Sequence, residues 1–316
     1  MLALFFGFEL FLHLPNAWAI DQLSEASRFD RVFDSASSRS PSPRVAAFGS
    51  SRFQYGFVPA AIEEQLGWDQ GSVSNLAFRA GTPQDFVNMY LEHRDQLQNL
   101  ETLVVEIGAY SFNWTVIVDE DFGDLRFRRW AGIQERFEAP GVVNKIDYLF
   151  GYALRTWDAR AVIRLTLTEA AFGDFDDSLP ITRNGRINIF VPAQQGPEDA
   201  TERPHIWDFR DFKFSEYQLR ALSKLLDLAE SDGTSVILVE TPRSPSFDAE
   251  VEASYASEDG LWRERVESAT GLQIVRLAHS DSLCAADWYK CAYDHAHMNP
   301  VGANSISSSV AQLLVQ

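Results

Sequence analysis

The chain has 316 residues, of which 46% are hydrophobic, and its 23 Phe and 8 Trp can fill a sizeable core. This length fits one large domain or two small ones. The formal net charge at pH 7 is −18. Binding to nucleic acid needs clustered Lys and Arg that displace counterions from phosphates, so this charge argues against a nucleic-acid partner.

The first 19 residues contain a short apolar run that is interrupted by Glu9 and His13. This run is shorter than the roughly 20 apolar residues that span a bilayer. Ala17-Trp18-Ala19 resembles a signal-peptidase site, although the basic residues that open a signal peptide are missing. We interpret residues 1–19 as the end of a signal or anchor segment that starts upstream of Met1; the alternative is an amphipathic helix packed on the domain. The first interpretation predicts an exported protein on the periplasmic or extracellular face, with this segment as its membrane contact.

Residues 20–43 are polar and end in a run of Ser and Pro, a composition that cannot bury enough apolar surface to fold alone. We interpret this stretch as a linker or as an arm wrapped over the surface. The main domain is expected to begin at residue 44 and to continue to residue 316.

From residue 44 the chain alternates short apolar strands with helices. The predicted strands are 45–48, 72–76, 103–107, 235–240 and 272–276. The predicted helices are 59–66, 82–97, 215–228, 261–268 and 303–314. Thr82 and Asp85 have the spacing of a helix-capping box. Short Val- and Ile-rich strands separated by helices predict a mostly parallel sheet covered on both faces. We therefore expect a three-layer α/β/α, flavodoxin-like sandwich around five strands.

Between about residues 110 and 210 the alternation stops, although 143–166 has room for a long helix. We interpret this stretch as one large insertion that follows the third strand and borders the carboxyl ends of the strands. Its many aromatic side chains are suited to stack on sugar rings or cover acyl chains, or else to bury one another in a small core.

Cys284 and Cys291 are the two cysteines of the chain, too few for a metal tetrad or a disulfide-dense scaffold. In an oxidising compartment they could form a bridge that stiffens the approach to the nearby His297. Two unpaired thiols are the alternative.

Gly49-Ser50-Ser51 directly follows the first predicted strand. Ligands of parallel α/β sheets bind beyond the carboxyl ends of the strands, and the turns after the second and third strands, at Gly81 and Gly108, reach the same edge. A serine in such a turn can act as a nucleophile when a base removes its proton and backbone N–H groups stabilise the oxyanion. Either serine could be this nucleophile, and helix capping is the alternative role.

His297 is the candidate base because Asp294, three residues earlier, can reach its Nδ1 through a turn and fix its tautomer. His295 is the competitor, but its adjacency to Asp294 makes that geometry awkward. Asp294, His295 and His297 also suggest a metal site, yet no further ligand cluster lies nearby. We expect neither a metal nor a cofactor.

Three segments occur in the order Gly49-Ser50-Ser51, Asn75 to Gly81, and Asp294-x-x-His297. In this order they resemble the SGNH (GDSL-like) hydrolase superfamily. The likeness is to its membrane-anchored branch, related to the alginate O-acetylation and lipoteichoic-acid D-alanylation proteins, in which Gly-Ser-Ser-Arg stands in place of Gly-Asp-Ser. It covers residues 44–108 well and 235–316 moderately, and it does not extend to the insertion.

The resemblance implies that Ser51 is the nucleophile, His297 the general base and Asp294 its orienting acid. It also implies that the backbone N–H groups of Ser51 and Gly81 contribute to an oxyanion hole.

One block of the family pattern is absent. The third block of the family is usually Gly-x-Asn, with the Asn side chain in the oxyanion hole, whereas this chain has Gly108-Ala109-Tyr110. Tyr110 or Asn113 would substitute, or the hole would have backbone donors alone, and loss of one donor typically costs about 10²–10³ in rate. Arg52 and Arg79 are candidates to recognise an anionic substrate group; a solvent-facing or helix-pairing role is the alternative.

These features predict a serine esterase or O-acyltransferase that acts through an acyl-enzyme on a cell-surface carbohydrate, another acylated polymer or a small ester. The alternative is a non-catalytic protein of the same fold that binds polysaccharide or serves in assembly. A nucleotide-binding flavodoxin-like protein is a third option, but Gly49-Ser50-Ser51-Arg52 lacks a glycine-rich phosphate cradle.

Overall fold

The computed structural model describes residues 39–78, 81–115 and 207–315 of the chain. These residues all fall in one compact unit, Asp34–Glu120 with Leu179–Gln316. The segment 1–19, Arg79 and most of the predicted insertion lie outside the described residues, so what was expected of them stays a prediction. None of the helices described is both long and apolar enough to cross a bilayer.

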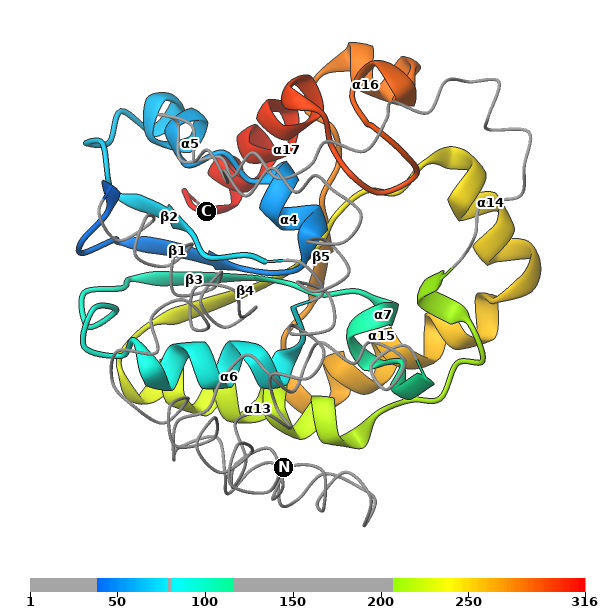
Figure 1. Cartoon of the computed structure of the whole chain (residues 1–316), viewed down its shortest axis with the longest axis horizontal. Helices are drawn as coiled ribbons and strands as arrows, with labels where there is room; N and C mark the ends of the chain where they lie inside the picture. Colours follow the sequence, from blue (N-terminus) through cyan, green and yellow to red (C-terminus); the bar gives the residue numbers. More distant parts are fainter. Residues whose placement is uncertain (1–38, 79–80, 116–206, 316) are drawn as a thin grey trace, which may run out of the picture. The chain divides into compact units, whose positions relative to one another are not determined.

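A five-stranded sheet forms the centre of the unit, and every strand pair in it is parallel. Its strands are β1 (Val45–Phe48), β2 (Val73–Asn75), β3 (Thr102–Glu106), β4 (Ser235–Glu240) and β5 (Ile274–Arg276). They lie in the order β2-β1-β3-β4-β5 (Figure 1). This is the flavodoxin-like order, and the predicted fold class is confirmed. The strand order reverses between β1 and β3, which is where ligands of such sheets bind.

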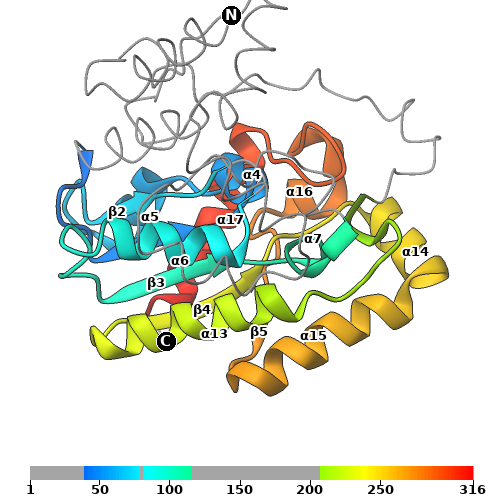
Figure 2. The same cartoon turned by 60° about the horizontal axis from the view of Figure 1, so that its bottom comes forward.

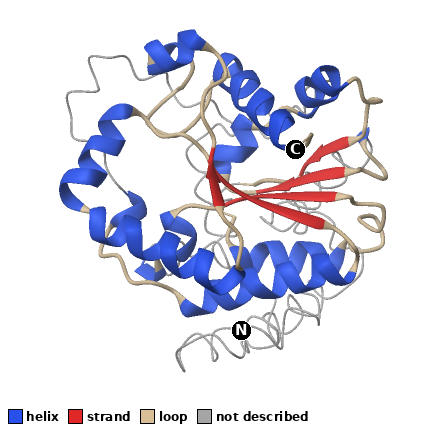
Figure 3. Ribbon diagram, turned by 180° about the vertical axis from the view of Figure 1, so that it is seen from behind, coloured by secondary structure: helices blue, strands red, loops and turns tan. Residues whose placement is uncertain are grey.

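Helices cover both faces of this sheet (Figures 1 and 3). One layer contains α4 (Ser51–Gly56), α5 (Pro59–Leu66) and α17 (Pro300–Leu313). The opposite layer, which comes forward in Figure 2, contains α6 (Pro83–Glu92), α13 (Glu216–Ser231) and α15 (Ala256–Thr270). The shorter elements are α7 (Ala109–Phe112), η3 (Trp207–Phe209), α14 (Pro245–Ser254), α16 (Ser282–Ala286) and η4 (Trp288–Lys290).

The strands are apolar throughout because both of their faces are covered. All four residues of β1 are buried, and Val45 and Ala47 pack with residues of α4, α5 and α17 in one core cluster. On the opposite face, Phe48 contacts the rings of Phe86 and Tyr90 in α6. A short, fully buried β1 therefore places the turn that follows it between the two helix layers.

Predicted and observed elements agree closely in the strands. The predictions 45–48 and 235–240 match β1 and β4 residue for residue. Strands β2 and β3 each differ from the prediction by one residue at both ends, and β5 begins two residues later than predicted. The predicted capping of α6 is also seen, since the Asp85 carboxylate accepts the backbone N–H of Thr82 at 3.0 Å. The helices α4, α7, α14 and α16 have no predicted counterpart. Helix α4 is only six residues long and is buried on most sides, so it lacks an amphipathic pattern.

Candidate active site

Ser51, His297 and Asp294 form one hydrogen-bonded chain at the carboxyl end of β1. Ser51 Oγ lies 2.9 Å from His297 Nε2, although the two residues are 246 positions apart. His297 Nδ1 lies 2.7 Å from Asp294 Oδ2. The structure thus brings together the three residues that the sequence nominates for nucleophile, base and acid, in the connectivity that a serine triad requires.

The position of Asp294 is set by its own short loop. Its Oδ1 accepts the backbone N–H groups of Ala296 and His297, both at 2.8 Å. An Ala292–Met298 bridge closes the loop. Burial raises the pKa of Asp294, but hydrogen bonding and charge interaction with His297, together with the two backbone donors, outweigh it and lower the pKa to about 2. Asp294 is therefore ionised at neutral pH and can stabilise an imidazolium at His297.

The two serines of the turn have different roles. Ser50 is the N-cap of α4, and its Oγ accepts the N–H of Arg52 at 3.2 Å. Ser51 is the first residue of the helix and turns its hydroxyl to His297. The first N–H groups of a helix have no partner within it, and no other described residue accepts that of Ser51. Ser51 therefore presents a hydroxyl and a backbone donor at the same point.

Two further residues, for which the sequence indicates no role, support the contact between Ser51 and His297. Tyr55 lies one turn after Ser51 on α4, and its ring meets the His297 imidazole edge-on, with centroids 5.6 Å apart. Asn75, at the end of β2, donates its amide to the carbonyls of Phe53 and Phe57, at 3.3 and 2.8 Å. The i, i+4 spacing of Ser51 and Tyr55 would have indicated a shared helix face, but only once α4 was known to be a helix.

Gly81 packs against the nucleophile turn, but its N–H is already in use. A Cβ at this position would lie 2.6 Å from the carbonyl oxygen of Gly49, so the close approach requires glycine. The Gly81 N–H donates to the carbonyl of Phe78 at 3.2 Å. In this structure the Gly81 N–H closes a local turn, and its role toward an oxyanion stays a prediction.

The Tyr110 side chain, a predicted oxyanion donor, lies against Glu106 and Arg52. Its buried hydroxyl donates to Glu106 Oε2 at 2.9 Å, and its ring lies 4.9 Å from the guanidinium carbon of Arg52. Burial and the nearby Glu106 carboxylate raise the pKa of Tyr110 well above its ordinary value. The phenol is committed to Glu106, so its predicted role as oxyanion donor is not supported by the geometry.

Asn113 is also used elsewhere. Its amide nitrogen donates to the carbonyls of Asp208 and Arg210, at 3.0 and 2.9 Å, and its oxygen accepts the N–H groups of Thr115 and Lys213. These bonds hold together the points where the chain leaves residue 115 and returns at residue 207. Asn113 therefore fastens this stem, and no donor remains for an oxyanion.

Arg52 is buried rather than available to a substrate. Its Nη2 lies 2.7 Å from both carboxylate oxygens of Asp208, in η3. Burial opposes the charge of Arg52, but the carboxylates of Asp208 and Glu106 hold its pKa above the ordinary value. Of the two interpretations of Arg52, the structure favours pairing between elements over recognition of an anionic substrate.

His295, the competitor for the role of base, faces a different element. Its Nδ1 lies 2.8 Å from Ser244 Oγ, and its carbonyl accepts the Ser244 N–H at 2.9 Å. Because Ser244 is the N-cap of α14, His295 docks the loop onto that helix. Burial lowers the pKa of His295. Across the described segments no group of three His, Cys, Asp or Glu side chains could hold a metal ion.

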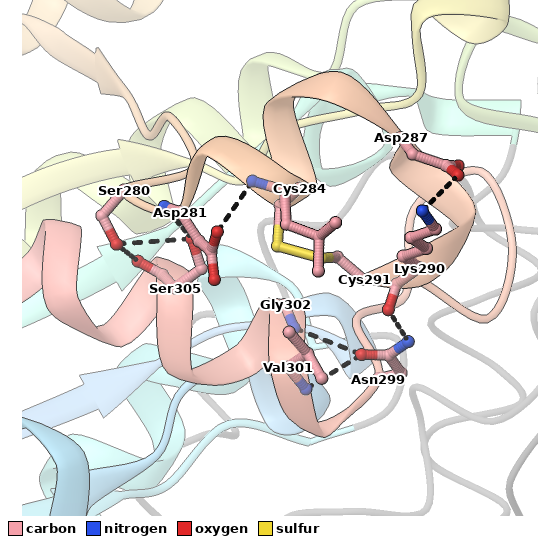
Figure 4. The surroundings of a disulfide bond; sticks show 11 residues. Ser280, Asp281, Cys284, Asp287, Lys290, Cys291, Asn299, Val301, Gly302 and Ser305 are labelled. Carbon is pink, nitrogen blue, oxygen red and sulfur yellow. Dashed lines mark hydrogen bonds and ion pairs between the residues drawn. A yellow bond between two sulfur atoms is a disulfide. The ribbon is translucent and has the colours of Figure 1, made fainter.

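Cys284 and Cys291 form a disulfide, which decides between the two alternatives left open for them (Figure 4). The bridged loop is fastened to the start of α17. The Asn299 N–H donates to the carbonyl of Cys291 at 3.0 Å, and a Cβ at Gly302 would collide with that same oxygen. Asn299 also caps α17 by accepting the N–H groups of Val301 and Gly302. The disulfide thus braces the segment that follows His297.

Neither a family model nor a curated protein matches the chain. Among solved structures it resembles a "putative platelet activating factor" from Streptococcus pneumonia, with 12% identity, 95% of this chain and 99% of that chain covered, and a TM-score of 0.43. It also resembles a GDSL-like lipase from Bacteroides thetaiotaomicron, with 10% identity, 92% and 98% of the two chains covered, and a TM-score of 0.37. Because both TM-scores are below 0.5, we infer neither family nor activity from these likenesses.

Proposed function

We propose that this protein is a serine hydrolase or acyltransferase of the SGNH type that acts on ester bonds. The observation that carries the proposal is the chain of contacts from Ser51 Oγ through His297 to Asp294, with distances of 2.9 and 2.7 Å. These three hydrogen-bonded residues lie beside the reversal of strand order between β1 and β3, which is where sheets of this kind bind their ligands.

The chemistry follows from these contacts. Ser51 Oγ attacks an ester carbonyl while its proton passes to His297 Nε2, and the ionised Asp294 stabilises the imidazolium through Nδ1. When the tetrahedral intermediate collapses, His297 returns the proton to the departing alcohol and an acyl-Ser51 ester remains. A second hydroxyl, from water or from a sugar, then loses its proton to His297 and attacks this ester, which releases the acid or a new ester.

Oxyanion stabilisation is the weaker half of the proposed site. Within the described segments nothing accepts the N–H of Ser51, whereas Gly81, Tyr110 and Asn113 are engaged in other hydrogen bonds. Each missing donor typically costs about 10²–10³ in rate. We therefore expect slow turnover of simple esters.

Substrate and location form the finer part of the proposal. We propose an exported protein that acts on a cell-surface carbohydrate or another acylated polymer, as in the membrane-anchored SGNH branch that its motifs resemble. The Cys284–Cys291 disulfide supports an oxidising compartment, because such bonds persist mainly outside the cytosol. Residues 1–19 remain the candidate membrane contact.

The proposal is tested with p-nitrophenyl acetate and a fluorophosphonate probe. The wild-type protein should show a burst of p-nitrophenol and should be labelled at Ser51, as located by peptide mass spectrometry. Both signals should disappear in Ser51→Ala and drop to background in His297→Ala. His295→Ala is the matched control, since its imidazole contacts Ser244 instead of Ser51, and it should keep both signals. Turnover that is equal in all four proteins would remove the triad.

One observation favours a second candidate, a non-catalytic polysaccharide-binding or assembly protein of the same fold. Three of the four predicted oxyanion donors are used within the structure, so the site would suit binding better than turnover. This candidate predicts that the probe never labels Ser51 while immobilised acylated glycans retain the protein. Labelling of Ser51 would reject it.

A further inference from the structure

Glu106 is a buried carboxylate directly behind the proposed nucleophile, and the mechanism above does not use it. It is the last residue of β3, the strand next to β1, and it is fully buried. One of its oxygens, Oε2, accepts three hydrogen bonds. Burial of an ionisable group is unfavourable unless it is compensated, so the position of Glu106 calls for an explanation.

Two of the three bonds fix Ser50, the residue before the nucleophile. The Ser50 backbone N–H donates to Glu106 Oε2 at 2.8 Å, and the Ser50 hydroxyl donates to the same oxygen at 2.9 Å. Tyr110 supplies the third bond, also at 2.9 Å. One carboxylate oxygen thus holds both the main chain and the side chain of the residue that caps α4.

The packing of Gly49 shows how closely Glu106 approaches this turn. A Cβ at Gly49 would lie 2.9 Å from the Cβ of Glu106 and 3.0 Å from its Oε2. A Cβ at Gly49 would also lie 2.7 Å from the Cβ of Phe53, so the turn packs against both Glu106 and Phe53, and glycine is required because of both contacts. Movement of Glu106 would move Gly49 and Ser50, and through them the start of α4 where Ser51 lies.

The ion pair between Arg52 and Asp208, which has no net charge, lies beside the Glu106 carboxylate. Arg52 is bound to Asp208, so removal of the Glu106 charge leaves the Arg52–Asp208 pair intact. Burial raises the pKa of Glu106, while Arg52 and the donated hydrogen bonds oppose that rise. We therefore expect a variant with a neutral residue at position 106 to keep the Arg52–Asp208 ion pair, so that the contribution of Glu106 to the site can be measured.

We infer that Glu106 is a positioning residue for Ser51, which it aims at His297 through its two hydrogen bonds to Ser50. The inference rests on the proposed function, because it assigns Glu106 a part in the reactivity of Ser51. Glu106 does not touch the reacting atoms. It defines where the turn places the Ser51 hydroxyl and N–H, and an error of about 1 Å in such a position can cost about 10²-fold in rate.

The test compares two substitutions of Glu106. Glu106→Met keeps an unbranched side chain of similar length but removes the acceptor, and kcat should fall at least about 100-fold with little change in KM. Glu106→Gln keeps one acceptor oxygen, so it should retain at least about a tenth of wild-type kcat, because neutral hydrogen bonds are weaker than charge-assisted ones. The rate constant for fluorophosphonate labelling of Ser51 should follow kcat in both variants.

Glu63→Met is the matched control for a purely structural effect. Glu63 is also buried, and its Oε1 accepts the N–H groups of Gly71 and Val73 at 2.9 and 3.0 Å. Because Val73 opens β2, this carboxylate lies at the amino end of the sheet, opposite the site. Glu63→Met should lower the melting temperature and leave kcat unchanged in assays below the transition.

A second variant tests whether Glu106 acts through Ser50. Ser50→Ala removes one of the two bonds to Glu106 together with the cap contact to the Arg52 N–H, and should lower kcat by an intermediate factor. In the Glu106→Met background the same substitution should cost less, because only the cap contact remains to be lost.

The outcomes separate the inference from the proposed function. A wild-type protein that is never labelled at Ser51 rejects the proposed function, and the inference fails with it. A labelled wild type together with an equally reactive Glu106→Met overturns the inference alone. Equal losses in Glu106→Gln and Glu106→Met would also overturn it, because they would show that the acceptor oxygen does not matter. A parallel loss in Glu63→Met would overturn it as well, because it would show a general loss of folding.

Discussion

The charged residues on the two sides of Ser51 differ in exposure and in how far apart they lie in the sequence. On one side, Asp294 and His297 lie three residues apart, and about a quarter of each side chain is exposed, 24% and 26%. Little chain entropy is lost when neighbours in sequence meet, so this pair can stay at the surface where a substrate can reach the imidazole.

On the other side, the charges are buried and come from distant parts of the chain. Glu106 contacts Ser50 across 56 residues, and Arg52 contacts Asp208 across 156 residues. Away from water, hydrogen bonds and ion pairs are stronger, and a missing partner is costly. Under the proposed function, the exposed side would carry out the chemistry and the buried side would fix the position of Ser51.

The largest expected effect is on the exposed side. Asp294→Asn keeps the size of the side chain but favours the wrong imidazole tautomer, so kcat should fall by about 10⁴-fold. Steady-state hydrolysis of p-nitrophenyl acetate measures this loss, and thermal unfolding should show that the variant stays folded. A fall of less than tenfold would mean that His297 does not depend on Asp294, and the exposed side would lose its assigned role.

The next effect is on the buried side and is measured as stability. Arg52→Met leaves Asp208 as a buried carboxylate without its ion-pair partner and removes a charge that offsets the burial of Glu106, so the free energy of unfolding should decrease by about 3–5 kcal/mol. The matched control is Arg44→Met, because the Arg44–Glu101 pair is exposed and should contribute less than about 1 kcal/mol. Urea unfolding of both variants measures the two losses. Equal losses would show that the buried Arg52–Asp208 pair contributes no more to stability than the exposed Arg44–Glu101 pair.

Loss of the disulfide should have a smaller effect on stability. Replacement of Cys284 and Cys291 by Ser opens a short loop, and the chain-entropy relation for loops of this size gives about 2–3 kcal/mol. The contact of Asp294 with His297 is held by its own loop, so kcat should change far less than in Asp294→Asn. Urea unfolding and p-nitrophenyl acetate turnover of the double variant check both statements. If kcat fell as far as in Asp294→Asn, the disulfide rather than the local bonds would hold the pair.

The smallest effect is a pH dependence of stability at Asp294. Its pKa is lowered from 3.8 to about 2 on folding, so the unfolded chain binds this proton more readily than the folded one. The contribution, about 2 kcal/mol, is complete above the unfolded pKa and is lost as the pH falls through the folded pKa. Unfolding free energies between pH 5 and pH 2 should therefore fall less steeply in Asp294→Asn than in the wild type; parallel curves would contradict the lowered pKa.

Much of the fold could be predicted because its signals are local. The apolar run Val45–Phe48 and the Val- and Ile-rich run Ser235–Glu240 are strands at the predicted residues. Thr82 and Asp85 likewise interact across a single turn. Helix α4 could not be predicted in this way, since Arg52 and Gln54 are polar residues that the tertiary structure buries.

The family pattern could nominate positions in the site but not the directions of side chains. The pattern proposes Tyr110 or Asn113 as a substitute for the oxyanion-binding Asn of the family's third block, with backbone donors alone as the alternative. The phenol turns to Glu106, and the amide turns to the returning chain at Asp208 and Arg210. No periodicity of the sequence indicates these partners, which are supplied by elements far along the chain.

The amino-acid sequence alone determined the strands, the alternation with helices, and the Asp294–His297 pair, since each depends on residues within a few positions of one another. The choice of Ser51 over Ser50 as the residue that faces the imidazole is already implied by the family resemblance. Only the tertiary structure decided that Arg52 pairs with Asp208 and that Glu106 contacts the turn before Ser51. These contacts depend on which strands become neighbours in the sheet, and hydrophobic alternation carries no information about that order.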